Sequence, residues 1–328
     1  MTANPARFKS ILVPLDASPL AEQAIPVAVA IAERARCKIK LVLVHQPLLA
    51  IEPGPAYTKM ELAMRKADRD YLRSVAAPLR ERLGRALSSA ILQGPVAPTL
   101  ARYIRELGTD LVVMTTHGRG GIRRAWLGSV VDRLIRTSEA PILVVRPTEP
   151  KAAEPSVGLT EILVPLDGSP LAEVVLEPVA TLARLWDAEI SLVQIVRPVI
   201  LTSDPPLPFP TGYSEQMTAT RRTEALDYIR DVAERLREAG VKASGVAVVG
   251  GGIAETLIDL ARPDKVSLVA VATHGRGGLR RMVLGSVADK LVRAAEVPVL
   301  VVRPAARRSR RNSEGHSLSV GALKLLMW

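Results

Sequence analysis

Residues 11–22 read Ile-Leu-Val-Pro-Leu-Asp-Ala-Ser-Pro-Leu-Ala-Glu, and residues 162–173 repeat them with Gly in place of Ala at the seventh position. A second stretch, Thr-His-Gly-Arg-Gly-Gly at residues 116–121, returns at residues 273–278. The first pair is separated by 151 residues (162 minus 11) and the second by 157 (273 minus 116). A period this long indicates a duplicated domain and not a solenoid of short repeats.

The duplication divides the 328-residue chain into four segments. We expect a first domain at residues 1–147, a linker at 148–158 and a second domain at 159–304. The linker is rich in Pro, Ala, Glu and Ser, which is typical of connecting segments. The last segment, residues 305–328, is a basic tail with little apolar periodicity, and we expect it to be flexible.

Each copy alternates short apolar runs with amphipathic segments. Such alternation predicts an α/β fold with a parallel sheet whose two faces are covered by helices. The expected strands are residues 10–15, 39–46, 87–93, 111–115 and 142–145 in the first copy, and 161–166, 189–196, 243–249, 267–272 and 297–302 in the second. We therefore expect two tandem, doubly wound, five-stranded sheets of the Rossmann-like type, each with strand order 3-2-1-4-5.

Helices are expected between these strands. The first strand of each copy is followed by Ser-Pro, an N-cap with proline at the first helical position. Because Pro26 and Pro178 lie inside the helical windows that follow, we expect a kink at each. The other expected helices are residues 59–83, 215–239, 129–136 and 286–293, and two that begin near residues 97 and 254.

The composition is that of a globular chain, with 48% hydrophobic and 23% charged residues. The one cysteine, Cys37, excludes an intrachain disulfide and a multi-cysteine metal cage. No apolar run approaches the roughly 20 residues that span a bilayer, and residues 1–16 lack a signal-peptide stretch. We therefore expect a cytoplasmic protein without membrane contact. The net charge of +11 favours anionic partners such as nucleotides.

Three features recur in both copies where the predicted fold brings them to one edge of the sheet. An Asp ends the first strand, a glycine-rich loop follows the fourth, and Gly-Ser opens the next helix. Ligands of doubly wound sheets bind at the carboxyl ends of strands, so we expect the Asp to face the glycine loop. There, glycines and helix-end amides suit a phosphate, arginines neutralise it, and Asp accepts from a ribose or a base amine. The candidates are Asp16, His117, Gly118, Arg119, Gly128, Ser129 and Val130, and in the second copy Asp167, His274, Gly275, Arg276, Gly285, Ser286 and Val287.

Structural explanations exist for the same residues. Glycine loops are common turns, and the Ser129-x-x-Asp132 spacing, repeated in the second copy, is that of a capping box. Asp16 can cap the following helix instead of contacting a ligand. For His117 and His274, a role in positioning the loop is favoured over a catalytic role, because no nucleophile or metal cluster accompanies them in the sequence.

These motifs resemble the nucleotide-binding signature of the universal stress protein family, Gly-x2-Gly-x9-Gly-[Ser/Thr]. The later elements of the signature match in both copies, at Gly118 with Gly128 and Ser129, and at Gly275 with Gly285 and Ser286. The first glycine of the signature is replaced by Thr115 and Ala272. The resemblance covers both copies, from about residue 8 to 147 and from 159 to 304.

The resemblance implies that one or both copies bind ATP, with or without Mg²⁺, and that Asp16 and Asp167 contact the nucleoside. It implies an adenine-pocket position late in the second strand, which we match to Gln46 and Ile195, where Val is usual. It further implies that the final strands of the two copies pair antiparallel about a pseudo-twofold axis. The chain would then be a pseudo-dimer of its own two domains, which can also form a homodimer.

Three functions compete at this point. The resemblance favours a stress-response regulatory protein that binds ATP in one or both copies and signals through conformation or partners. The second is an enzyme, a slow ATPase or adenylyl transferase, although the sequence has no Gly-x-x-x-x-Gly-Lys-[Ser/Thr] P-loop. The third is nucleic-acid binding through the basic surface, which is least favoured because charge alone gives non-specific affinity.

Overall fold

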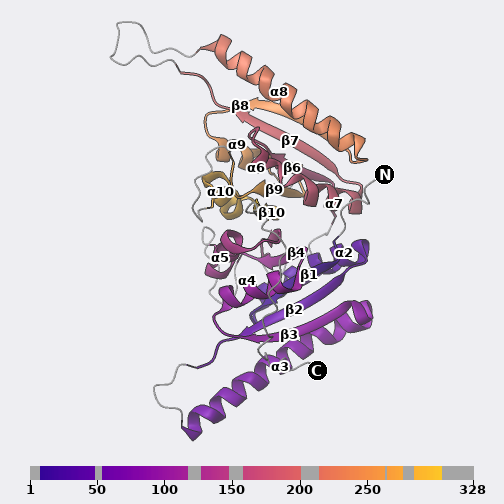
Figure 1. Ribbon diagram of the computed structural model, residues 1–328, viewed down its shortest axis with the longest axis vertical. Helices are drawn as coiled ribbons and strands as arrows, with labels where there is room; N and C mark the ends of the chain where they lie inside the picture. The colour runs from indigo at the N-terminus through magenta and orange to yellow at the C-terminus, as the bar shows by residue number, and fades with distance from the viewer. Residues whose placement is uncertain are drawn as a thin grey trace, which may run out of the picture.

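The computed structural model describes residues 8–48, 54–116, 127–147, 158–200, 214–262, 264–275 and 284–304. Within these ranges, ten strands form one sheet in the order β3-β2-β1-β4-β5-β10-β9-β6-β7-β8 (Figure 1). The basic tail lies outside the described residues, as does nearly all of the expected linker.

The first half of the chain supplies one side of this sheet. Its elements are β1 (Ser10–Leu15), α1 (Pro19–Glu22), α2 (Ala24–Ala35), β2 (Lys38–His45), α3 (Pro55–Leu83), η1 (Gly84–Ala86), β3 (Leu87–Gln93), α4 (Val96–Leu107), β4 (Leu111–Thr115), α5 (Ser129–Thr137) and β5 (Ile142–Val145). The strands pair in parallel, which confirms the predicted order 3-2-1-4-5.

The second half repeats this order. Its elements are β6 (Glu161–Pro165), α6 (Pro170–Glu173), α7 (Leu176–Trp186), β7 (Glu189–Val196), α8 (Glu215–Glu238), β8 (Ala243–Val249), α9 (Ile253–Leu260), β9 (Leu268–Ala272), α10 (Ser286–Ala294) and β10 (Val299–Val302). Its five strands are again parallel, in the order β8-β7-β6-β9-β10.

The two halves join through their last strands. β5 and β10 pair antiparallel, with Leu143 opposite Leu300 at the centre of the register. This confirms the expected pairing, and it merges the two sheets into one, with α3 and α8 at opposite ends of the molecule (Figure 1). An edge strand of each half is thereby covered by the other half, which removes two exposed edges.

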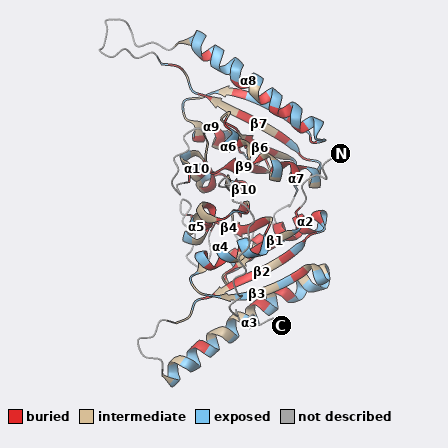
Figure 2. Cartoon of the chain, in the orientation of Figure 1, coloured by how far each residue is buried: buried red, intermediate tan, exposed pale blue. Residues whose placement is uncertain are grey.

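The core follows from strands that are buried on both faces. Every residue of β4 and β9 is buried, and successive residues point to opposite sides of the sheet. Leu111 and Val113 pack on one face among residues of α2, whereas Val112 and Met114 pack on the other among residues of α4 and α5. Figure 2 shows burial concentrated along the sheet and exposed surface on α3 and α8.

The predicted kinks at Pro26 and Pro178 are wrong, because each proline lies at the start of a new helix. In the first half the helix is interrupted at Gln23, between α1 and α2, so that Pro26 lies in the first turn of a new helix. In the second half the interruption falls at residues 174–175, and Pro178 lies in the first turn of α7. A proline is tolerated in a first turn because its missing N–H has no helical partner there.

Candidate functional site

The glycines that open α5 and α10 allow a close backbone approach. The amide of Gly128 donates to the carbonyl of Thr116 at 2.9 Å, and that of Gly285 donates to the carbonyl of Thr273 at 2.9 Å. A Cβ at Gly128 would lie 3.1 Å from this carbonyl oxygen, and one at Gly285 would lie 2.9 Å from it. Glycine therefore holds the start of each helix against the end of the strand that precedes the loop.

The two helix N-termini carry no side-chain cap. Gly128 and Gly285 are the N-cap residues, so the alternative explanation of Ser129 and Ser286 as capping-box residues does not hold. Asp132 instead pairs with Arg136 one turn along α5 at 2.8 Å, as its counterpart does in α10. The first helical bond of α5 is donated by Asp132 to Gly128, so the amides of residues 129–131 precede it.

Asp16 supports the N-cap of α1 but is not the N-cap residue itself. The N-cap of α1 is Ser18, whose Oγ accepts from the amide of Ala21. Asp16 Oδ1 accepts from the Ser18 amide at 3.0 Å and from its hydroxyl at 2.6 Å. Asp167 makes the same two bonds to Ser169, at 3.0 and 2.6 Å. These bonds hold Oδ1 of each strand-ending carboxylate in place.

In the second half, the carboxylate of Asp167 directly faces the glycine loop. A Cβ built on Gly275 would overlap Oδ2 of Asp167, so the backbone of Gly275, the last described residue before the loop, lies close to this oxygen. The predicted juxtaposition of Asp and loop is confirmed there. His274 next to it contacts the Thr273 hydroxyl through Nδ1 at 2.9 Å. Four predicted loop residues lie outside the described residues, namely His117, Gly118, Arg119 and Arg276.

All predicted site residues that the structure describes line one of two cavities. The first cavity, of about 1260 Å³, is lined by Asp16, Gln46, Thr115, Gly128, Ser129 and Val130. The second, of about 1010 Å³, is lined by Asp167, Ile195, Ala272, His274, Gly275, Gly285, Ser286 and Val287. Both volumes lie at or above the upper end of the range of small-molecule pockets, about 300–1,000 Å³.

The strand register corrects one predicted correspondence. Pro14 pairs with Val42, and the equivalent Pro165 pairs with Val193. Counting on from these pairs, the counterpart of Ile195 is Val44, two residues before Gln46. The match of Gln46 to Ile195 is therefore wrong, and the first cavity does have an apolar residue at that position. Gln46 is exposed just beyond the end of β2 and still lines the cavity.

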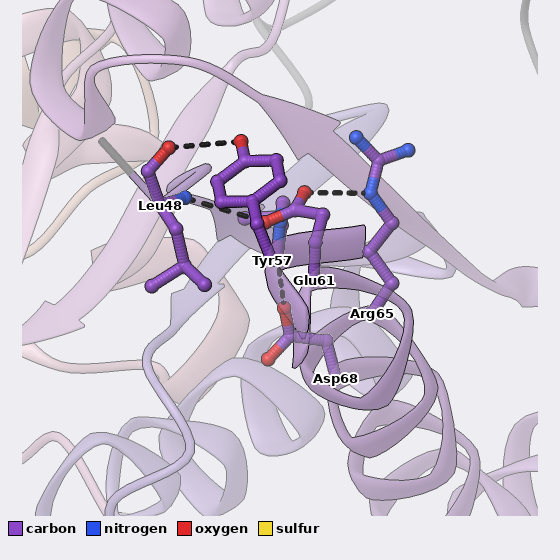
Figure 3. Close-up of polar contacts among 6 residues, drawn as sticks. Leu48, Tyr57, Glu61, Arg65 and Asp68 are labelled. Atoms are coloured by element: carbon purple, nitrogen blue, oxygen red, sulfur yellow. Dashed lines mark hydrogen bonds and ion pairs between the residues drawn. The ribbon is translucent and has the colours of Figure 1, made fainter. Parts of the chain in front are cut away.

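The sequence did not lead us to predict a buried ionic cluster on the wall of the first cavity (Figure 3). Nε2 of His45 lies 2.8 Å from Oε1 of Glu61, and its Nδ1 lies 2.6 Å from Oδ2 of Asp68. Arg65 donates to Glu61, and together with His45 it lowers the pKa of the Glu61 carboxyl to about 2. The seven-residue spacing of Glu61 and Asp68 on one helix face was the available signal.

Cationic side chains also line the cavities beyond those predicted. Arg136 and Arg293 line the first cavity, although Arg293 belongs to the second half of the chain. Arg146 of the first half donates to the backbone carbonyl of Arg293 at 2.5 Å. Arg197 and Arg221 line the second cavity. Within the described ranges, no group of three or more His, Cys, Asp or Glu is arranged to hold a metal ion.

The fold and the site together define a class of protein. It is a duplicated, doubly wound α/β protein with a cavity at the strand ends of each half. Residues 7–146 and 159–303 match the Universal stress protein family. The chain therefore belongs to the universal stress protein family, which places it among stress-response proteins. Searched over the described residues, the structure contains no helix long and apolar enough to cross a membrane.

Similar proteins extend over most of the chain. Universal stress protein Rv1996 of Mycobacterium tuberculosis is 28% identical over 321 residues, covering 89% of this chain and 94% of its own length. Universal stress protein Rv2005c of the same organism is 32% identical over 221 residues, covering 66% and 68%. The crystal structure of a universal stress protein from Archaeoglobus fulgidus has the same fold, with a TM-score of 0.64 at 16% identity over 90% of this chain and 97% of that one.

Proposed function

We propose that the protein is a regulatory stress-response protein that binds an adenine nucleotide, with ATP as the expected ligand, in each of its two cavities. The observation that carries this proposal is the uncapped N-terminus of α5 and of α10, which shares a cavity with the carboxylate that ends β1 or β6. Nucleotide occupancy would change the contacts of the cavity walls and so inform partner proteins.

The phosphate end of the ligand is assigned to the helix N-termini. The amides of Ser129 and Val130 precede the first helical hydrogen bond and lie at the positive end of the helix dipole. The exposed Ser129 hydroxyl adds a donor, and the Arg136 guanidinium lining the same cavity adds positive charge. Ser286 and Val287 supply the same groups in the second half.

The nucleoside end is assigned to the strand ends. Asp16 and Asp167 offer carboxylate oxygens that accept hydrogen bonds from ribose hydroxyls. Val44 and Ile195 give each cavity an apolar wall for the base. The chain's part is binding and orientation, and Mg²⁺, if it accompanies the ligand, would be held largely by phosphate oxygens.

Ser129 and Ser286 are the residues at which to test the proposal. Both are exposed at the first helical position, where a carboxylate favours the helix but repels a phosphate. The variant S129E/S286E is expected to lose ATP binding in calorimetric titration, whereas the neutral control S129Q/S286Q keeps most of it. Equal ATP affinity in the two variants would contradict the proposal.

A further inference from the structure

The ionic cluster of His45, Glu61 and Asp68 gives the first cavity a wall of unusual chemistry. His45 is 3% exposed, and both of its ring nitrogens face carboxylate oxygens at 2.8 and 2.6 Å. The two carboxylates hold the ring from both sides and fix its orientation.

The second half contains the same wall without the charges. The counterpart of His45 in β7 is Val196, by the register that relates β2 to β7. The Leu48 amide donates to Glu61 at 3.3 Å, and the Val199 amide donates to Thr218 at 3.0 Å, which makes Thr218 the counterpart of Glu61. The same helix offset of 157 residues (218 minus 61) makes Ala225 the counterpart of Asp68.

The fold therefore does not require these charges. Val196 and Ala225 are buried together in a small apolar cluster, in the same frame of strand and helix that holds the ionic cluster in the first half. Apolar residues often replace a buried ion pair without loss of stability. A charged cluster that is present in one copy and absent from the other calls for an explanation in the cavity that it borders.

Asp68 presents an acceptor to that cavity. His45 and Asp68 both line the first cavity, together with Ser129 at the phosphate end. Only Oδ2 of Asp68 is engaged by His45, and among the described residues no donor contacts its Oδ1. The neighbouring Leu48 and Met64 are apolar. This part of the wall combines Oδ1 of a carboxylate that His45 holds in place with an apolar surface. Such a wall suits a nucleobase that carries an amino group.

We propose that the Asp68 carboxylate, positioned by His45, makes the first cavity selective for a nucleotide whose base donates a hydrogen bond, whereas the second cavity lacks this selectivity. The inference rests on the proposed function and goes beyond it, because it makes the two sites different. In the second cavity the corresponding wall is Val196 and Ala225, and the neighbouring Glu224 is exposed. Arg197 and Arg221 at that cavity favour recognition by charge.

The test isolates the first cavity with Ser286→Glu, which blocks the second. The affinities of this variant for ATP and for purine riboside triphosphate, which lacks the amino group, are compared by titration calorimetry. ATP is expected to bind about tenfold more tightly or better, because a hydrogen bond to a charged acceptor is lost with the analogue. The triple substitution H45V/E61T/D68A introduces the residues of the second half. Added to Ser286→Glu, it is expected to reduce the ratio of the two affinities to the value for the second cavity, which is measured in Ser129→Glu.

A second variant guards against misfolding of the triple substitution. Asp68→Asn keeps the size of the side chain and an oxygen for His45, but turns an amide toward the ligand, and is expected to reduce the ratio as well. An unchanged ratio in both variants, with ATP still bound, would overturn this inference and leave the proposed function standing. Absence of ATP binding in the wild-type chain would overturn both.

Discussion

The amide nitrogen of Gly285 lies 2.9 Å from the carbonyl oxygen of Thr273. This bond ties the first residue of the α10 cap to the end of β9 across the glycine loop, as Gly128 does with Thr116 in the first half. The donors offered to a phosphate are therefore positioned by the fold itself. A bulky residue at either glycine would disturb that geometry directly, which is why Ser129 and Ser286 are better probes of binding.

Gly285→Ala is expected to destabilise the chain. Its Cβ would meet the Thr273 carbonyl at 2.9 Å, and because that oxygen belongs to the backbone it cannot rotate away. We expect a loss of about 1–3 kcal/mol in the free energy of unfolding, measured by urea titration. Gly251→Ala is the control, since nothing lies within 4 Å of its Cβ position. Equal stability of the two variants would show that the backbone around residue 285 moves away from the Thr273 carbonyl at no cost in free energy.

Asp167→Asn separates the two roles of the strand-ending carboxylate. Asparagine keeps an oxygen that can accept from the Ser169 amide and hydroxyl, so the cap of α6 and the melting temperature should change little. The loss of charge should weaken ATP binding at the second cavity by about tenfold. The effect is measured in the Ser129→Glu background, which leaves that cavity as the ligand site. Unchanged affinity would restrict Asp167 to its structural role.

The lowered pKa of Glu61 predicts that this residue contributes to the loss of folding stability in acid. Its pKa in the folded chain is about 2, below the usual 4.5, because Arg65 and His45 stabilise the carboxylate. A lowered pKa contributes stability that is fully present above pH 4.5 and is lost as the pH falls toward 2. The difference in free energy of unfolding between wild type and Glu61→Thr should therefore shrink over this interval. Glu234→Gln, at an exposed position of α8, is the control, and a constant difference would contradict the assignment.

The pairing of β5 with β10 can be tested by cross-linking. Leu143 and Leu300 lie directly opposite one another and are buried on the same face of the sheet. In a Cys37→Ala background, L143C/L300C should form a disulfide within one chain, visible as a mobility change on a non-reducing gel at any dilution. L143C/V301C is the control, because adjacent strand residues point to opposite faces. Efficient cross-linking of the control alone would mean a different register.

Much of the fold follows from the sequence because local patterns and tertiary packing agree. The strands at residues 10–15, 87–93, 111–115 and 142–145 have the predicted bounds, since each is a short run between turn or helix signals. The antiparallel pairing of the last strands came from the family resemblance, as nothing in those apolar runs specifies a partner. The unexpected start of α3 at Pro55 reflects the tolerance of proline in a first turn.

The site was less predictable where it depends on how helices cross strands. The repeated Asp, Gly and Gly-Ser motifs led to residues that line the two cavities. The cluster around His45 was missed because its partners are 16 and 23 residues away, and their contact depends on how α3 lies on β2. The misplaced match of Gln46 to Ile195 has a related cause: no motif in the second strand fixes its register, which only the pairing with β1 and β6 reveals.

Native mass spectrometry of the intact chain with ATP tests the central claim most directly. The account predicts two bound nucleotides per wild-type chain, one in each of Ser129→Glu and Ser286→Glu, and none in the double variant. The neutral glutamine variants should retain both. A wild-type chain that binds no nucleotide, or a double variant that still binds two, would contradict the assignment of ligand sites to the N-termini of α5 and α10.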